Sequence, residues 1–417
     1  MIIGQGNPDR LLSNGQIFTL CDQALSHLDL ADKRILVIIP DHTRTGPIDL
    51  LFRNLYRLLA QRVKLLHFII ALGTHPPMSQ SAMLKRVGLD EREWKEKYAK
   101  AHFFNHDWKD PEQLKHIGTI PADEIAEISQ GLMTDAVDIT INKLVFDYDL
   151  LLILGPTFPH EVVGFSGGNK YLFPGIAGQE IIDMFHWLGA LITNPVIIGT
   201  KYTPVRAVVD RAARFLPMER LCISLVVKGQ GLAGLYIGSP EEAWEAAADL
   251  SEQVHIIYKT HSFIKVLSRA PEMYDDIWTA GKCMYKLEPV VADGGELIIY
   301  APHIKEVSAT HGRIIEKIGY HVRDYFHLQK DRFKDIPGGV MAHSTHVKGI
   351  GSYINGIERP RIKVTLATQI SEETCNKINL GYCRPDTINI NDWQNKEDQG
   401  ILYVPKAGEI LHRIKKE

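Results

Sequence analysis

One stretch of this chain gathers residue types that can move protons and bind anions. His160 is followed ten residues later by Lys170, which ends the glycine-rich run Phe165-Ser166-Gly167-Gly168-Asn169-Lys170, and His186 comes sixteen residues after the lysine. Imidazoles exchange protons near neutral pH, and a cation can hold a carboxylate or a phosphate. The run is not a P-loop, because Tyr171 follows the lysine where such a loop needs Ser or Thr. We therefore expect chemistry other than magnesium-nucleotide transfer.

Further candidate residues lie where predicted strands end. Asp41 and Arg44 follow the apolar run 34–39, His75 follows the run 65–72, and His303 and Lys305 follow the run 297–300. Taken singly, each of these side chains is more often a solvated or hydrogen-bonded surface group than a catalytic one. Taken together they predict one site, because the carboxyl ends of parallel strands meet at a common crevice.

Two common classes of hydrolase are not favoured. The run Gly164-Phe165-Ser166-Gly167-Gly168 lacks the order of a nucleophile elbow between a strand and a helix, and no His-Glu-x-x-His zinc motif occurs. The five cysteines are scattered without a metal-type pair, so we expect buried or half-buried thiols in a reducing compartment.

The elements that must position these residues are those of an α/β fold. The apolar run 34–39, the amphipathic segment 48–59 and the apolar run 65–72 predict a βαβ unit. The glycine loop lies between a buried strand at 148–155 and a helix at 179–188, an arrangement that presents backbone N–H groups to a phosphate. Segments 222–227 and 234–237 predict a hairpin, and a helix follows it to about residue 253.

A second domain is predicted beyond Arg269-Ala270-Pro271. It should contain a helix at 276–290, strands at 297–300, 362–367 and 400–404, and a basic terminal helix. The predicted fold is therefore two α/β domains, residues 1–268 and 269–417, with the active site in the cleft between them. A chain of 417 residues is long enough for two domains.

Composition excludes some partners. With 45% hydrophobic residues, 23% charged residues and a formal net charge of −3, nothing indicates binding to nucleic acid or to a membrane surface. No run is apolar enough to span a bilayer, and residues 1–20 lack the features of a signal peptide, so we expect a cytoplasmic protein.

The candidate residues resemble the lactate racemase family, which comprises nickel-dependent 2-hydroxyacid racemases and epimerases. The resemblance rests on Asp41-His42-Thr43-Arg44, on Gly73-Thr74-His75, and on the spacing of His160, Lys170 and His186 within the run that ends at Pro174-Gly175-Ile176. It implies that Lys170 carries a pyridinium-3-thioamide-5-thiocarboxylic acid mononucleotide, the nickel-pincer nucleotide, and that His186 is the protein ligand of nickel. His75 and His160 would be the acid/base pair.

The resemblance also implies roles for the remaining candidates. Arg44 and Lys305 would hold the substrate carboxylate, Asp41 would orient neighbouring groups, and the backbone of Ser166, Gly167 and Gly168 would bind the cofactor phosphate. Enzymes that make the cofactor would be transient partners, and a homodimer is compatible with the family.

The implied reaction is inversion at C2 through a planar 2-oxo acid. Hydride moves to the pyridinium ring while one histidine takes the hydroxyl proton, and hydride returns to the opposite face with the other histidine as partner. Lactate-specific relatives have a glutamine three residues before Lys305, where this chain has Pro302 followed by His303. We therefore expect His303 to contact a more polar side chain than that of lactate, such as a sugar acid or a dicarboxylic hydroxyacid.

A second interpretation stays open. The same crevice could belong to a non-catalytic protein that binds a pyridinium nucleotide or a hydroxyacid. A sensor would not need a histidine on each face of the substrate, so the paired histidines favour an enzyme.

Overall fold

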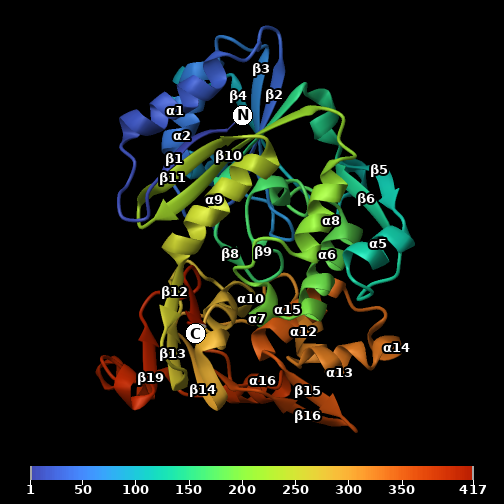
Figure 1. Ribbon diagram of the computed structural model, residues 1–417, viewed down its shortest axis with the longest axis vertical. Helices are drawn as coiled ribbons and strands as arrows, with labels where there is room; N and C mark the ends of the chain where they lie inside the picture. The colour runs from blue at the N-terminus through green and yellow to red at the C-terminus, as the bar shows by residue number, and fades with distance from the viewer. Residues whose placement is uncertain (1, 416–417) are drawn as a thin grey trace. The chain divides into compact units, whose positions relative to one another are not determined.

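The computed structural model describes residues 2–415 and divides into two compact units. Unit 1 comprises residues 2–158, 165–182 and 204–254, and unit 2 comprises residues 159–164, 183–203 and 255–415. Each unit has its own sheet with helices, as the ribbon of Figure 1 shows, so the predicted α/β class is confirmed. Within residues 2–415, no helix is long and apolar enough to cross a bilayer.

The sheet of unit 1 has seven strands in the order β1-β11-β10-β7-β2-β3-β4. The strands from β10 to β4 are parallel, and β11 and β1 complete the sheet in antiparallel register. Its strands are β1 (Ile3–Gly6), β2 (Arg34–Pro40), β3 (Leu65–Ala71), β4 (Ala101–Asn105), β7 (Leu150–Pro156), β10 (Glu219–Lys228) and β11 (Gly231–Gly238). A separate hairpin pairs β5 (Leu114–Ile120) with β6 (Val137–Asn142).

Helices cover both faces of this sheet, which explains why its central strands are apolar throughout. Ile35, Val37 and Ile39 of β2 pack with buried residues of α1 and α2 on one face, whereas Ala247 and Leu250 of α9 pack on the other. The helices of unit 1 are α1 (Asn14–Ser26), α2 (Ile48–Leu59), α3 (Gln80–Arg86), α4 (Glu91–Lys97), α5 (Ala122–Ile128), α8 (Pro204–Ala213) and α9 (Pro240–His255).

The strand order reverses between β2 and β7. The chain runs from β2 outward to β3 and β4, and then returns to the opposite side of β2 as β7. Ligands of open α/β sheets bind at such a reversal, beyond the carboxyl ends of the strands. The predicted βαβ unit is confirmed as β2, α2 and β3, and the predicted hairpin as β10 and β11.

The sheet of unit 2 is parallel, with the order β18-β17-β14-β13-β19. Its strands are β13 (Phe263–Arg269), β14 (Val291–Ala301), β17 (Lys363–Thr368), β18 (Gly381–Tyr382) and β19 (Ile401–Val404). Two smaller pairs are β12 (Ile256–Lys259) with β20 (Leu411–Ile414), and β15 (Gly351–Ile354) with β16 (Ile357–Pro360).

Short helices accompany this second sheet. They are α7 (Asn194–Ile197), α10 (Ile277–Ala280), α11 (Lys282–Tyr285), α12 (Gly312–Ile318), α13 (Arg323–His327), α14 (Lys330–Phe333), α15 (Gly338–Lys348) and α16 (Glu372–Lys377). Helix α6 (Gln179–Ile192) begins with residues of unit 1 and ends with residues of unit 2.

Two expectations differ from the structure. The predicted basic terminal helix is wrong: residues 411–414 form β20, whose backbone pairs with β12 while Leu411 is fully buried. The division also differs from a single boundary at 268/269, because β13 ends at Arg269 and is an inner strand of the unit 2 sheet. The four cysteines Cys21, Cys222, Cys283 and Cys375 are buried and Cys383 is half-buried, all as free thiols, as expected.

Candidate functional site

In unit 1, Asp41 and His75 form a hydrogen-bonded pair at the ends of β2 and β3. The Nδ1 atom of His75 contacts the Oδ2 atom of Asp41, and Thr43 donates to Oδ1 from its hydroxyl at 2.7 Å and from its backbone N–H at 3.1 Å. Since a carboxylate only accepts, the ring proton lies on Nδ1 and the Nε2 atom is left to accept a proton.

Asp41 remains charged although it is only 3% exposed. Burial opposes its ionisation, but His75, Arg44 and the Thr43 hydroxyl outweigh burial and hold the pKa of the Asp41 carboxyl well below its usual range. The Asp41–His75 pair is therefore a carboxylate–imidazole dyad, with the acid held ionised.

Arg44 lies in the loop that follows Asp41. Its carbonyl accepts from Arg86 Nη2 at 2.9 Å, and Arg86 Nε also donates to the Pro40 carbonyl at 3.2 Å, so one half-buried arginine holds both ends of this loop. The guanidinium carbon of Arg44 lies 5.4 Å from the centroid of the Phe158 ring.

The loop that carries Lys170 is fixed by side chains from α8 and α9. Arg206, which is 3% exposed, donates to the carbonyls of Phe165 at 2.6 Å and Gly167 at 3.2 Å. Trp244 donates from Nε1 to the intervening Ser166 carbonyl at 2.9 Å, and the Arg206 guanidinium lies 4.1 Å from the Trp244 ring centroid. Three consecutive carbonyls are thereby held by side chains.

The residue before the lysine is also tied down. Asn169 donates from Nδ2 to Asp210 at 3.0 Å and to Glu241 at 2.7 Å. Gly167 has φ of +88°, and a Cβ there would lie 2.2 Å from the Thr157 hydroxyl, so only glycine fits. This hydroxyl is buried and has no hydrogen-bond partner within the described residues.

The Lys170 loop lies beside the Asp41–His75 dyad. The backbone N–H of Gly73 donates to the Gly175 carbonyl at 2.9 Å, which links the turn before His75 to the end of the lysine loop. Burial raises the pKa of the Tyr171 hydroxyl, and the nearby charges of Arg44 and Asp41 also act on this pKa, so Tyr171 lies close to both residues. Unit 1 therefore brings together Asp41, Arg44, His75 and the loop of Lys170.

The other predicted site residues, His160, His186, His303 and Lys305, belong to unit 2. His160 is 5% exposed, and its Nδ1 atom accepts the backbone N–H of Val162 at 3.1 Å while lying 3.4 Å from Oε2 of Glu161. The other oxygen of Glu161 accepts from the Tyr285 hydroxyl at 3.1 Å. His160 thus also has a carboxylate beside its Nδ1 atom.

His186 lies on α6, one turn after Asp183. The Oδ1 atom of Asp183 accepts the backbone N–H of Gly339 at 2.8 Å, so α6 is held to the first turn of α15. The Gly338 and Gly339 pair permits this approach, since a Cβ at Gly338 would lie 2.6 Å from the Asp183 carbonyl.

Three further histidines of unit 2 are buried, namely His311 and the α15 residues His343 and His346. His311 and His343 lie on the Trp278 ring, with centroid distances of 4.4 and 4.2 Å, and His343 Nε2 accepts from the Tyr320 hydroxyl at 3.2 Å. Burial lowers the pKa of His346 to about 4 and lowers that of His343 well below its usual value. His343 and His346 are therefore neutral at physiological pH.

His303 and Lys305 differ in their surroundings. The His303 Nε2 atom donates to the Tyr274 carbonyl at 3.0 Å, so one of its two ring nitrogens is already used. Lys305 lines a cavity of about 740 Å³ whose other polar lining residues include Ser308, Thr310, Arg313, Ser371 and Thr374. No group of three or more His, Cys, Asp or Glu residues suited to a metal ion occurs among residues 2–415.

Sequence reasoning missed Glu161, Arg206 and Trp244. Glu161 could have been noticed as the acid that follows a candidate histidine directly. No local signal identifies Arg206 and Trp244, because they lie 36 and 74 residues beyond Lys170 and meet its loop only in the folded chain.

Comparisons with known proteins identify relatives. Residues 19–196 match the family described as the lactate racemase N-terminal domain. Lactate racemase of Thermoanaerobacterium thermosaccharolyticum is 27% identical over 280 residues, which cover 66% of this chain and 61% of that protein. Lactate racemase of Lactiplantibacillus plantarum is 24% identical over 285 residues, covering 66% and 62%. The match thus spans about three fifths of the length of these curated relatives.

Two solved structures share the fold over nearly the whole chain. A crystal structure of a Thermotoga maritima protein has a TM-score of 0.90 and 33% identity, and the match covers 99% of this chain and 100% of that one. The lactate racemase apoprotein of T. thermosaccharolyticum has a TM-score of 0.72 and 20% identity, with coverage of 99% and 94%.

Proposed function

We propose that this chain, whose residues 19–196 match the lactate racemase N-terminal domain, is an isomerase of the lactate racemase family that inverts C2 of a 2-hydroxyacid by proton-coupled hydride transfer. The observation that best supports the proposal is the Asp41–His75 dyad, which lies beside the loop of Lys170 at the strand reversal of unit 1. His160 supplies a second imidazole with a carboxylate at the same ring nitrogen.

The side chains divide the proton chemistry between them. His75 takes the hydroxyl proton at Nε2, and the charge of Asp41 stabilises the imidazolium that forms. His160 performs the same step for the opposite enantiomer and donates its proton when the 2-oxo acid is reduced. Arg44 binds the substrate carboxylate, since a guanidinium can form two parallel bonds with it, and Lys305 adds a second cation.

The family implies a lysine-tethered nickel-pincer nucleotide, and the residues of the loop fit such a group. Lys170 would carry it, His186 would bind the nickel, and the backbone of Ser166, Gly167 and Gly168 would hold its phosphate. The buried Thr157 hydroxyl, which has no protein partner among the described residues and faces Gly167, is a donor that a bound polar group would satisfy. When bound, this cofactor supplies the hydride acceptor.

The function is tested with protein produced together with the cofactor-making enzymes. We expect a panel of enantiopure 2-hydroxyacids, including lactate, a dicarboxylic acid and a sugar acid, to show loss of optical purity for at least one member. His75→Ala should abolish this loss while leaving the adduct in place. Hydroxyacids that bind the loaded protein but keep their optical purity would instead indicate a non-catalytic binding protein.

Lys170→Ala tests the cofactor link by intact-mass measurement. The wild type should show a covalent adduct after co-production, and the variant should not, because only a lysine amine at this position of the loop can form the bond. Lys143→Ala, at an exposed lysine of the same unit, is the matched control and should keep the adduct. An adduct retained in Lys170→Ala contradicts the assignment.

A further inference from the structure

The Nδ1 atom of His160 lies between two groups of opposite hydrogen-bonding character. The backbone N–H of Val162 can only donate to it, at 3.1 Å, whereas the carboxylate of Glu161 can only accept from it, at 3.4 Å. We propose that Glu161 is a positioning residue that selects the tautomer of His160, accepting Nδ1–H so that Nε2 carries the lone pair that takes the substrate proton. The inference rests on the proposed catalytic role of His160.

The two partners of Nδ1 favour different forms of the ring. The Val162 N–H favours a neutral imidazole with its proton on Nε2, and that form cannot accept a proton from a hydroxyl group. The general base and the imidazolium both carry a proton on Nδ1, and both can donate it to Glu161. The Nδ1 atom of His75 contacts the Asp41 carboxylate, and no backbone N–H within residues 2–415 donates to it. His160 therefore depends on its carboxylate to oppose the backbone donor.

Glu161 is held in place for this task. Its Oε1 atom accepts from the hydroxyl of Tyr285, which is 3% exposed and lies on α11, so that Oε2 faces the His160 ring. Burial opposes the ionised form of Glu161, but His346, Lys286 and Lys282 favour it, and the pKa of the Glu161 carboxyl is lowered. Lys286 also donates to the carbonyl of Pro159, which fixes the backbone directly before His160.

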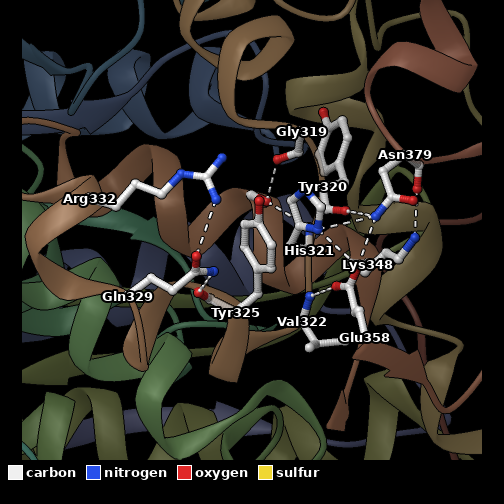
Figure 2. Close-up of polar contacts among 11 residues, drawn as sticks. Gly319, Tyr320, His321, Val322, Tyr325, Gln329, Arg332, Lys348, Glu358 and Asn379 are labelled. Carbon is white, nitrogen blue, oxygen red and sulfur yellow. Dashed lines mark hydrogen bonds and ion pairs between the residues drawn. The ribbon is translucent and has the colours of Figure 1, made fainter. Parts of the chain in front are cut away.

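Unit 2 contains a second histidine–carboxylate pair of a different kind, drawn in Figure 2. His321 Nδ1 lies 2.9 Å from Oε2 of Glu358, and the ring is stacked on Tyr325 with a centroid distance of 3.7 Å. Glu358 also accepts from the Val322 N–H at 2.6 Å and from Asn379 at 3.0 Å. This carboxylate joins three segments of the chain, so the pair has a structural role and provides a matched control.

The inference is tested by ¹⁵N NMR of the histidine rings in cofactor-free protein. The resonances of His160 are those that disappear in His160→Gln. In Glu161→Gln we expect the Nδ1 resonance of His160 to move toward the range of a bare nitrogen and Nε2 toward that of an N–H. Glu358→Gln should leave His160 unchanged. Tyr285→Phe, which keeps the carboxylate but frees Oε1, should give an intermediate shift. An unchanged His160 tautomer in folded Glu161→Gln overturns the inference.

Turnover of the cofactor-loaded protein provides a second readout. Glu161→Gln should lower kcat by roughly ten- to a hundred-fold, a part of the 10²–10⁴ that a positioned acid or base supplies, with little change in KM. Glu161→Asp should restore part of the loss. If the wild type racemises and Glu161→Gln is equally fast, the inference fails. If the tautomer shifts but no hydroxyacid is racemised by the wild type, Glu161 still sets the tautomer and the proposed function fails.

Discussion

The buried charge of Asp41 contributes to the stability of the fold as well as to the proposed proton chemistry. Within residues 2–415, the hydrogen bonds of its carboxylate come from the neighbouring groups of His75 and Thr43. Because these contacts hold its pKa below the unfolded value of about 4, the ionised form stabilises the fold above that pH. The stabilisation is lost as pH falls through the lower folded pKa.

Asp41→Asn should therefore change activity and pH response together. Near pH 7 we expect a loss of about 1.5–3 kcal/mol in the free energy of unfolding, typical of hydrogen bonds to a charged group. Turnover should fall by about 10²–10⁴, because an amide N–H can donate to Nδ1 and favours the wrong tautomer of His75. Urea unfolding at pH 7 and pH 3.5 checks the stability loss. The difference in the free energy of unfolding between variant and wild type should be smaller at pH 3.5. A gap that stays constant would contradict it.

At the scale of elements, the Lys170 loop depends on helices that follow it in sequence. Arg206 of α8 and Trp244 of α9 hold three carbonyls of the loop, and Asp210 and Glu241 hold the side chain of Asn169. These contacts limit the motion of a loop that contains two glycines. Limited motion would keep the Lys170 amine in a fixed position, which the proposed covalent link to a cofactor requires.

Trp244→Phe and Arg206→Met test this arrangement separately. Trp244→Phe keeps an aromatic ring but loses the donor to Ser166, so we expect a loss of about 1 kcal/mol. Arg206→Met leaves two buried carbonyls without their donor and should cost more, about 2–4 kcal/mol, with slower adduct formation by mass measurement. Arg57→Met removes an exposed arginine 4.6 Å from the Phe18 ring centroid and should stay within about 0.5 kcal/mol of wild type. If Arg206→Met and Arg57→Met lowered the free energy of unfolding equally, the role of Arg206 in holding the Lys170 loop would be contradicted.

At the scale of the whole molecule, neither unit is a continuous stretch of chain. Residues 183–203 lie between two segments of unit 1 yet supply essential contacts of unit 2. The Asp183 carboxylate accepts the backbone N–H of Gly339 at the start of α15. Asn194 donates to the Tyr285 carbonyl at 3.0 Å and to the carboxylate of the fully buried Glu288 at 3.3 Å.

A fragment of residues 255–417 should therefore not fold cooperatively, although it contains every strand of the larger unit 2 sheet. Burial already raises the pKa of Glu288, and removing Asn194 takes one of its donors away. Circular dichroism during thermal unfolding should show no sharp transition. Asn194→Ala in the full chain should lose only about 1–3 kcal/mol. A sharp transition of the fragment at the melting temperature of the full chain would contradict this view.

Local patterns in the sequence were enough to predict the α/β class and the parts of the site that lie at strand ends. The apolar runs of β2 and β7 are continuous because both faces of a parallel sheet are covered, and polar residues must follow where such strands end. The sequence predicted that Asp41 and His75 follow the ends of two parallel strands, and the structure adds that the two side chains contact each other.

Only the tertiary structure decided which groups support these side chains. His160 and Lys170 are ten residues apart yet belong to different units, and Arg206 reaches the lysine loop from α8. The predicted terminal helix is instead β20, whose hydrogen-bonding partner β12 begins 155 residues earlier, at Ile256. Periodicity reports only which face of a segment is buried, whereas these partners depend on contacts between segments distant in the chain.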